Sequence, residues 1–126
     1  MSQFTPKLAR ASVQDGITVV TVTAEQIREA DQAYALRDEI LEILNESSPS
    51  CLVLDLGELT FVGSIGFLAF LGVRRHLAGG RIVICNMSGP VHDMFAICQL
   101  ISPDPAKKAP FEAADTLDAA VALLKA

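Results

Sequence analysis

The residues with the clearest chemical potential lie in a short turn, Gly63-Ser64-Ile65-Gly66. A serine in such a turn can serve as a nucleophile or as a cap for the amide groups of a helix. A nucleophile turn of the Gly-x-Ser-x-Gly type needs a glycine at position 62, where this chain has Val62. The residues alone therefore favour Ser64 as a helix cap.

The other reactive side chains are few and scattered along the chain. His76 and His92 have no cysteine at ligand spacing, and we interpret them as surface or helix-end residues. Cys51, Cys85 and Cys98 form no Cys-x-x-Cys pair, and we predict that all three are small buried side chains in a reducing compartment. No glycine-rich phosphate loop and no His-Glu-x-x-His motif is present. We therefore expect no metal, no cofactor and no enzymatic activity.

Composition limits the class of protein further. The 126 residues are 51% hydrophobic and 20% charged, which fits one folded domain. Fifteen acidic against ten basic residues give a net charge of −5, which disfavours direct binding to nucleic acid or to a membrane surface. No apolar run reaches the roughly 18–20 residues of a membrane span, and the first residues lack the apolar core of a secretory signal. We expect a cytoplasmic protein with a flexible tail at residues 1–7 and one domain at residues 8–126.

Strand and helix patterns alternate along that domain. β-branched residues flank the Asp15-Gly16 pair, a strong signal for a hairpin. The later apolar runs alternate with amphipathic segments, which predicts a mixed α/β sheet of four or five strands with about four helices mainly on one face. The expected strands are 8–14, 17–22, 51–55 and 81–85, and a short segment at 111–113 is the candidate fifth strand. The expected helices are 31–46, 64–77, 91–97 and 117–124, the last capped by Asp115 or Thr116. The predicted core contains Val19, Ile40, Leu44, Leu52, Leu54, Leu68, Ile82, Ile84, and Leu117 or Leu124.

The helix expected after Ser64 is apolar on two sides. At 100° per residue, Ile65, Leu68, Ala69 and Gly72 fall on one side, and Phe67, Phe70, Leu71 and Arg74 fall nearly opposite. A helix that lies on a sheet needs one apolar stripe only. The second stripe is covered by a neighbouring helix of the domain or by a partner protein, and the sequence leaves both possibilities open.

The segment LDLGELTFVGSIGFLAFLG, residues 54–72, resembles the signature of the STAS-domain anti-sigma factor antagonists. In that family an apolar strand leads into an Asp-Ser-Ser-Gly-like turn, a helix follows, and a further glycine lies some six residues on. Gly63-Ser64-Ile65-Gly66 occupies the turn, and Gly72 matches the later glycine. The resemblance extends over most of the chain and implies a single STAS-like α/β domain.

The resemblance implies a partner-switching function. Ser64 matches the serine that the partner, an anti-sigma factor with ATP-dependent kinase activity, phosphorylates in this family. The unphosphorylated form would bind that partner and so release a sigma factor, phosphorylation would end binding, and a PP2C-type phosphatase would reset the cycle. The implied contact residues are Glu25, Gly63, Ser64, Ile65, Gly66, Phe67 and Phe70. A monomer or weak dimer is expected.

The sequence departs from the family pattern on both sides of Ser64. Gly63 stands where an acidic residue is usual, and Ile65 stands where a small hydroxyl residue is usual. In the segment 23–27, Glu25 alone remains of an acidic pair. The alternative function is therefore a STAS scaffold or accessory module of a signalling or transport assembly that is not phosphorylated.

Overall fold

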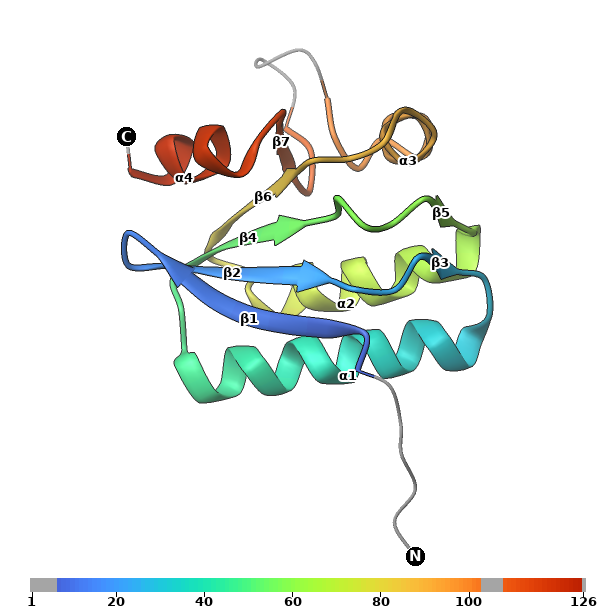
Figure 1. The fold of residues 1–126 in the computed structure, drawn as a ribbon, viewed down its shortest axis with the longest axis horizontal. Helices are drawn as coiled ribbons and strands as arrows, with labels where there is room; N and C mark the ends of the chain where they lie inside the picture. Colours follow the sequence, from blue (N-terminus) through green and yellow to red (C-terminus); the bar gives the residue numbers. More distant parts are fainter. Residues whose placement is uncertain (1–6, 103–107, 126) are drawn as a thin grey trace, which may run out of the picture.

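A mixed five-stranded sheet forms the centre of the structure, a computed structural model that describes residues 7–102 and 108–125 (Figure 1). The strand order is β1-β2-β4-β6-β7, in which β1 runs antiparallel to β2 and every other neighbouring pair is parallel. The strands are β1 (Ala9–Gln14), β2 (Ile17–Val22), β4 (Cys51–Asp55), β6 (Arg81–Cys85) and β7 (Glu112–Ala114). The predicted mixed sheet is confirmed, with β7 displaced by one residue from its expected position.

The hairpin between β1 and β2 has the predicted two-residue turn. Asp15 and Gly16 both have positive φ angles, 53° and 79°, as a type I′ turn requires. Gln14 and Ile17 close the hairpin as opposed residues. The Asp-Gly pair thus fixes the register of the first two strands.

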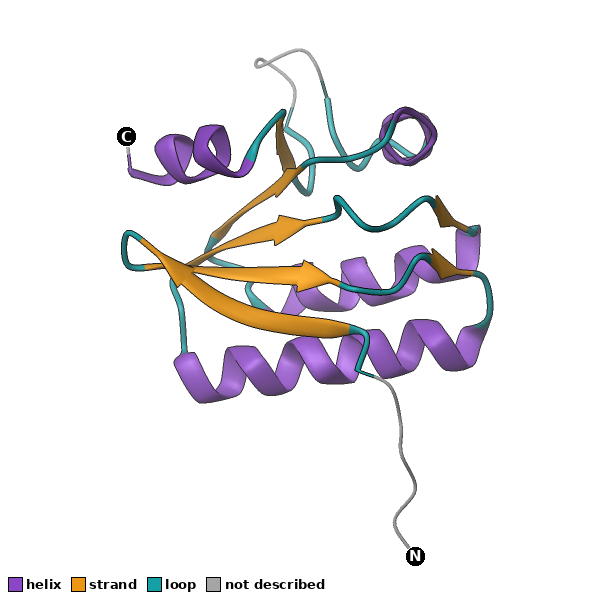
Figure 2. Ribbon diagram, viewed as in Figure 1, coloured by secondary structure: helices purple, strands orange, loops and turns teal. Residues whose placement is uncertain are grey.

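Four helices cover the sheet on two sides (Figure 2). They are α1 (Ala30–Ser47), α2 (Phe67–His76), α3 (Gly89–Ile97) and α4 (Leu117–Lys125). Side chains of α1, α2 and α3 contribute to the larger core, whereas α4 lies on the opposite face and covers a smaller core. The smaller core consists of Ile17, Val19, Val53, Val83, Cys85, Ala120 and Val121. The expectation of helices mainly on one face is therefore confirmed.

Local signals at the helix ends also agree with the sequence. The Ser88 hydroxyl accepts a hydrogen bond from the amide of Val91 at 3.4 Å, and Pro90 lies in the first turn of α3. Of the two residues proposed to cap α4, Thr116 does so, because its hydroxyl accepts from the amide of Ala119 at 3.1 Å. Residues 1–6 of the expected tail lie outside the described residues.

Most of the predicted core is buried, and the exceptions lie on two helices. Leu68 was predicted to be buried but is 44% exposed, because the buried stripe of α2 runs between the two apolar sides expected from the sequence. In α4, Ala120 and Val121 are buried, whereas Leu117 and Leu124 are only half-buried. The other predicted core residues are buried as expected: Val19, Ile40, Leu44, Leu52, Leu54, Ile82 and Ile84.

The cysteine prediction holds for one residue of three. Cys85 is buried, and the pKa of its thiol is raised to about 12. Desolvation is the larger cause, and the negative charge of the nearby Asp55 carboxylate is the smaller one. Cys51 is half-buried, and Cys98 is exposed in the turn after α3. The prediction of burial is wrong for Cys98 because it lies in an exposed segment with Ile97 and Gln99, and the chain returns to the core only at Leu100.

Candidate functional site

A two-stranded parallel ribbon, β3 (Gln26–Ile27) with β5 (Phe61–Val62), positions the turn that contains Ser64. The amide of Gly63 donates to the carbonyl of Ile27 at 2.9 Å, and the amide of Thr60 donates to the carbonyl of Glu25 at 2.7 Å. The exposed residue Glu25 is thereby held at the same end of the molecule as the turn. The ribbon was not predicted, because two residues per strand are too few to show a period.

Ser64 is the first residue of a short 3₁₀ helix, η1 (Ser64–Gly66), that leads directly into α2. Gly63, with φ −79° and ψ 168°, occupies the capping position, and the amide of Gly66 donates to its carbonyl at 2.8 Å. Ser64 is exposed, and within the described part of the chain its hydroxyl has no hydrogen-bond partner. The structure therefore does not support the capping interpretation of Ser64.

The two glycines of the turn are under different packing constraints. A Cβ atom at Gly66 would lie 2.6 Å from Cγ2 of Val62 and 2.9 Å from Cγ2 of Ile27, both of which are core residues. At Gly63 the nearest heavy atoms to such a Cβ, on Phe61, would be 3.7 Å away, an ordinary contact. Gly66 thus allows η1 to lie directly against the ribbon, whereas nothing in the packing requires a glycine at position 63.

An aromatic residue and a cation lie beside the turn. The Arg28 guanidinium carbon is 4.3 Å from the centroid of the Phe61 ring, and the Arg28 Nε donates to Gln26 Oε1 at 2.5 Å. Phe61 is 38% exposed. Arg28 directly follows β3 and Phe61 opens β5, so the ribbon brings them together. Sequence reasoning missed this pair because it depends on the unpredicted pairing of β3 with β5.

The exposed face of α2 carries an apolar stripe that begins near Ser64. Leu68 and Leu71 are 44% and 37% exposed, and they follow Ser64 at intervals of four and three residues. We call Ser64, Leu68 and Leu71 the α2 stripe. Its two leucines are large apolar side chains in contact with solvent, as at many surfaces that bind proteins.

Two residues expected at that surface lie in the core instead. Phe67 and Phe70 are 5% and 0% exposed, and their rings pack edge-on against Phe95 at centroid distances of 4.9 and 5.4 Å. Their assignment to a partner surface is corrected, because their side chains point toward α3. Ile65 is half-buried, and Gly66 is buried.

A helix of the same domain covers another part of α2. A Cβ atom at Gly72 would lie 2.8 Å from Cδ of Arg37, which belongs to α1. Ala69, one turn before Gly72, is 1% exposed. The sequence left open whether a neighbouring helix or a partner protein covers the second apolar side. Helix α1 covers the side of α2 that contains Ala69 and Gly72, while the leucines of the α2 stripe stay exposed.

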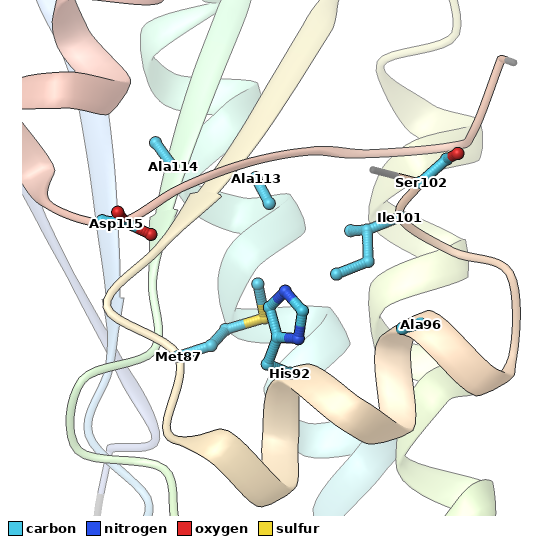
Figure 3. Close-up of a pocket in the computed structure, with 8 residues that line it drawn as sticks. All are labelled: Met87, His92, Ala96, Ile101, Ser102, Ala113, Ala114 and Asp115. Atoms are coloured by element: carbon cyan, nitrogen blue, oxygen red, sulfur yellow. The ribbon is translucent and has the colours of Figure 1, made fainter. Parts of the chain in front are cut away.

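A separate cavity of about 410 Å³ lies between α3 and the segment around β7. Figure 3 shows the His92 ring among Met87, Ile101 and Ala113 in this cavity. His92 Nδ1 is 3.9 Å from a carboxylate oxygen of Asp93, and its side chain is 52% exposed. His92 and the exposed His76 at the end of α2 are surface histidines, as predicted. Among residues 7–102 and 108–125, no three His, Cys, Asp or Glu side chains are grouped so that they could hold a metal ion.

The mixed sheet, the helices that cover it and the serine turn at the start of α2 define a domain of the STAS class. The family model for the STAS domain matches residues 9–107, and the chain belongs to this family. The resemblance inferred from residues 54–72 is therefore confirmed.

Solved structures with this fold include anti-sigma factor antagonists and part of an anion transporter. An anti-sigma factor antagonist from Mycobacterium paratuberculosis matches with a TM-score of 0.75 and 24% identity, over 94% of this chain and 93% of that one. The anti-sigma factor antagonist SpoIIAA in its unphosphorylated form matches with a TM-score of 0.62 and 17% identity, over 93% and 97%. The murine solute carrier 26 family member A9 anion transporter matches with a TM-score of 0.70 and 16% identity, over 92% of this chain but 19% of the transporter. At these identities the matches establish a shared fold. Within the described residues of this chain, no helix has the length and apolar character needed to cross a membrane.

Proposed function

We propose that this protein is an anti-sigma factor antagonist that works by partner switching. In the unphosphorylated form it binds an anti-sigma factor, and phosphorylation of Ser64 ends that binding. The observation that carries the proposal is the exposed hydroxyl of Ser64 at one end of the apolar α2 stripe. A modification at this position would lie at the edge of the surface that a partner is expected to cover.

The physical basis of the switch is a charge introduced beside an apolar contact. Phosphorylation adds about −1.5 to −2 charges and three acceptor oxygens. A bound partner would have to desolvate that charge next to Leu68 and Leu71, which are exposed in the free protein. The start of a helix accommodates an anion well, so the domain itself would stay folded. Phosphorylation would thus act on binding and leave the stability of the domain largely unchanged.

The contact surface in this proposal differs from the one expected from sequence. It consists of the α2 stripe with Gly63, Ile65 and Glu25, together with the Arg28–Phe61 pair. Phe67 and Phe70 support it from the core. The partner is an anti-sigma factor that acts as a serine kinase with ATP, a PP2C-type phosphatase removes the phosphate, and both act in the cytoplasm. In this cycle the chain is a substrate and a binding protein and does not act as a catalyst.

The proposal is tested by comparing acidic substitutions at two exposed serines. Ser64→Asp is expected to weaken binding to a cognate anti-sigma factor, and Ser64→Ala is expected to bind normally but to accept no phosphate. Ser48→Asp adds the same charge at the exposed C-terminal end of α1 and serves as the control. Affinities are measured by calorimetry, and thermal melts verify the fold of each variant. Equal affinities for wild type, Ser64→Asp and Ser48→Asp would contradict a switch at Ser64.

A second function is favoured by the residues on either side of Ser64. Gly63 stands where an acidic residue is usual in the family, although the packing leaves room for a side chain there. Ile65, which stands in place of a small hydroxyl residue, is half-buried. Both features suit a STAS module that binds constitutively within a signalling or transport assembly. Incubation with ATP and candidate anti-sigma factors, followed by mass spectrometry, separates the two functions. Stable binding with no phosphate on Ser64 would favour the constitutive module.

A further inference from the structure

The first strand of the sheet has an open outer edge. Among residues 7–102 and 108–125, β1 pairs with β2 alone, and its residues 10–13 are all exposed. Val13 is 71% exposed, the second-highest value among the exposed large hydrophobic side chains of the described residues. An exposed edge strand of this length is a template for pairing with another strand.

The register of the hairpin determines which backbone groups face outward. In a two-residue type I′ hairpin the closing residues, Gln14 and Ile17, exchange hydrogen bonds, and the pairs alternate from there. The amide and carbonyl groups of Ala9, Ala11 and Val13 therefore point away from β2. The amide of Ala9 confirms this orientation, because it donates to Glu39 Oε1 of α1 at 3.1 Å. Ala11 and Val13 are left with two outward donors and two outward acceptors.

An apolar groove runs beside these four groups. It has a volume of about 260 Å³ between β1 and the end of α1. Its apolar lining is Ala11, Val13 and Ile43, and Ser12, Thr18, Glu46 and Ser47 complete the lining. Ala11 and Val13 lie opposite Val20 and Thr18 of β2. A strand added at the edge would thus find hydrogen-bonding groups and an apolar surface side by side.

We propose that a second copy of this chain binds at this edge, with the two β1 strands antiparallel and Ser12 on the two-fold axis. In this register Ala11 of each copy pairs with Val13 of the other, so all four outward groups of each strand are used. On the groove face, each Val13 covers the Ala11 and Ile43 side chains of its partner. The register also leaves the amide of Ala9 bonded to Glu39.

On the face of β1 opposite the groove, the same register brings charges of opposite sign on the two copies close together. Arg10 of one copy lies opposite Gln14 of the other, and Gln14 Nε2 donates to the Asp118 carboxylate at 3.0 Å. Arg10 is 65% exposed and has only a 3.5 Å contact with Glu58. Lys125 in the same place is paired with Asp15 at 3.5 Å, so the guanidinium of one copy lies near the Asp118 carboxylate of the other. This charge pairing favours a second copy over an unrelated strand.

This interface is independent of the proposed partner surface. β5, which leads into Ser64, lies at the opposite end of the molecule from the turn that joins β1 to β2 (Figure 1). Pairing through β1 therefore leaves the α2 stripe open on both copies. A dimer would present two partner surfaces, whichever of the two functions proposed above applies.

The register is tested by a disulfide on the two-fold axis. Residues opposed without hydrogen bonds have Cα atoms about 4.5 Å apart, which is within the range that a disulfide spans. Ser12→Cys, in a Cys98→Ser background that removes the exposed native thiol, is expected to form a covalent dimer on mild oxidation. Arg10→Cys in the same background is the control, because its two copies would lie four residues apart, about 13 Å. Crosslinking of Arg10→Cys, or none of Ser12→Cys, would overturn this register.

The affinity is tested by sedimentation across concentrations. Wild type is expected to approach twice the 13.4 kDa of the single chain as concentration rises. Val13→Glu places a carboxylate beside Glu46 in the groove and is expected to weaken the dimer at least about tenfold, whereas Val13→Thr should keep it. A wild-type chain that stays monomeric at about 1 mM, or a dimer unaffected by Val13→Glu, would overturn the proposal.

Discussion

Gly63 and Gly66, on either side of Ser64 and Ile65, illustrate how the site depends on single residues. Both are part of one turn, but only Gly66 lies where a Cβ atom would approach buried side chains more closely than 3.0 Å. Gly66 therefore belongs to the architecture that presents Ser64, and Gly63 belongs to the surface around it.

Alanine substitutions at these two positions are expected to differ sharply. Gly66→Ala forces Val62 and Ile27 to move and should lower the free energy of unfolding by about 1–3 kcal/mol. Gly63→Ala meets only ordinary contacts, and at φ −79° it should change that free energy by less than about 0.5 kcal/mol. Urea denaturation of both variants measures the difference. Equal losses would mean that the turn does not pack against the ribbon as described.

At the residue scale, the sequence predicted the position of Ser64 better than the surface around it. A serine before an amphipathic helix is recognisable locally, and it is indeed at the helix start. The assignment of Phe67 and Phe70 failed because a single period cannot tell which of two apolar sides faces the core. The buried face of this segment runs through Gly66, Ala69, Phe70 and Val73. Packing against α1 and α3 determines which face is buried.

Among the elements, β7 is a short strand that a charged pair holds to β6. Two nitrogens of Arg81 donate to the two carboxylate oxygens of Glu112 at 2.8 and 2.7 Å, and a third donates to the carbonyl of Leu123 at 3.1 Å. These hydrogen bonds from Arg81 lower the pKa of Glu112 below its usual 4.5. One arginine thus links β6 to both β7 and α4.

Stability from this pair is expected to depend on pH. Because the pKa of Glu112 is lower in the folded than in the unfolded state, the contribution is present above about pH 4.5 and is lost as the pH falls through the folded value. Arg81→Met should cost about 0.2–1 kcal/mol at neutral pH, since both side chains are more than two-fifths exposed. Denaturant unfolding at pH 7 and pH 3 should show a smaller difference between wild type and variant at pH 3. A difference that grows on acidification would contradict this account.

At the element scale, long periodic segments were predictable and short ones were not. The helix expected at 31–46 is observed at Ala30–Ser47, and the strands of the central sheet match their apolar runs closely. β3 and β5 escaped prediction because two-residue strands are defined by their mutual pairing across 35 positions. The ribbon that places Ser64 is therefore a tertiary feature and has no local pattern.

At the scale of the whole molecule, an aromatic cluster joins α2, α3 and the segment that precedes β7. The Phe95 ring of α3 contacts Phe67 and Phe70 of α2 and also Phe111, at centroid distances of 4.9, 5.4 and 6.3 Å. These edge-on contacts connect α2 to α3 and to the segment that enters β7. Phe95 is fully buried.

Removal of the Phe95 ring is expected to destabilise the whole domain. Phe95→Ala should lower the free energy of unfolding by about 3–5 kcal/mol, and Phe95→Leu should lower it by less because more volume is retained. Thermal and urea unfolding of both variants measure the effect. A loss under about 1 kcal/mol for Phe95→Ala would show that α3 is not an integral part of the main core.

The strand order also bears on the order in which the strands pair during folding. The β1–β2 hairpin closes over two residues, whereas every other neighbouring pair in the central sheet is parallel and joins strands separated by at least one helix. Local pairs form in microseconds, and long loops must close before the parallel pairs can form. We therefore expect the hairpin to form first and β4, β6 and β7 to be added on its β2 side, while the described chain leaves the β1 side unfilled. A newly made molecule consequently exposes its self-complementary edge from the first stage of folding, when other unfinished copies are the nearest strands available to pair with it.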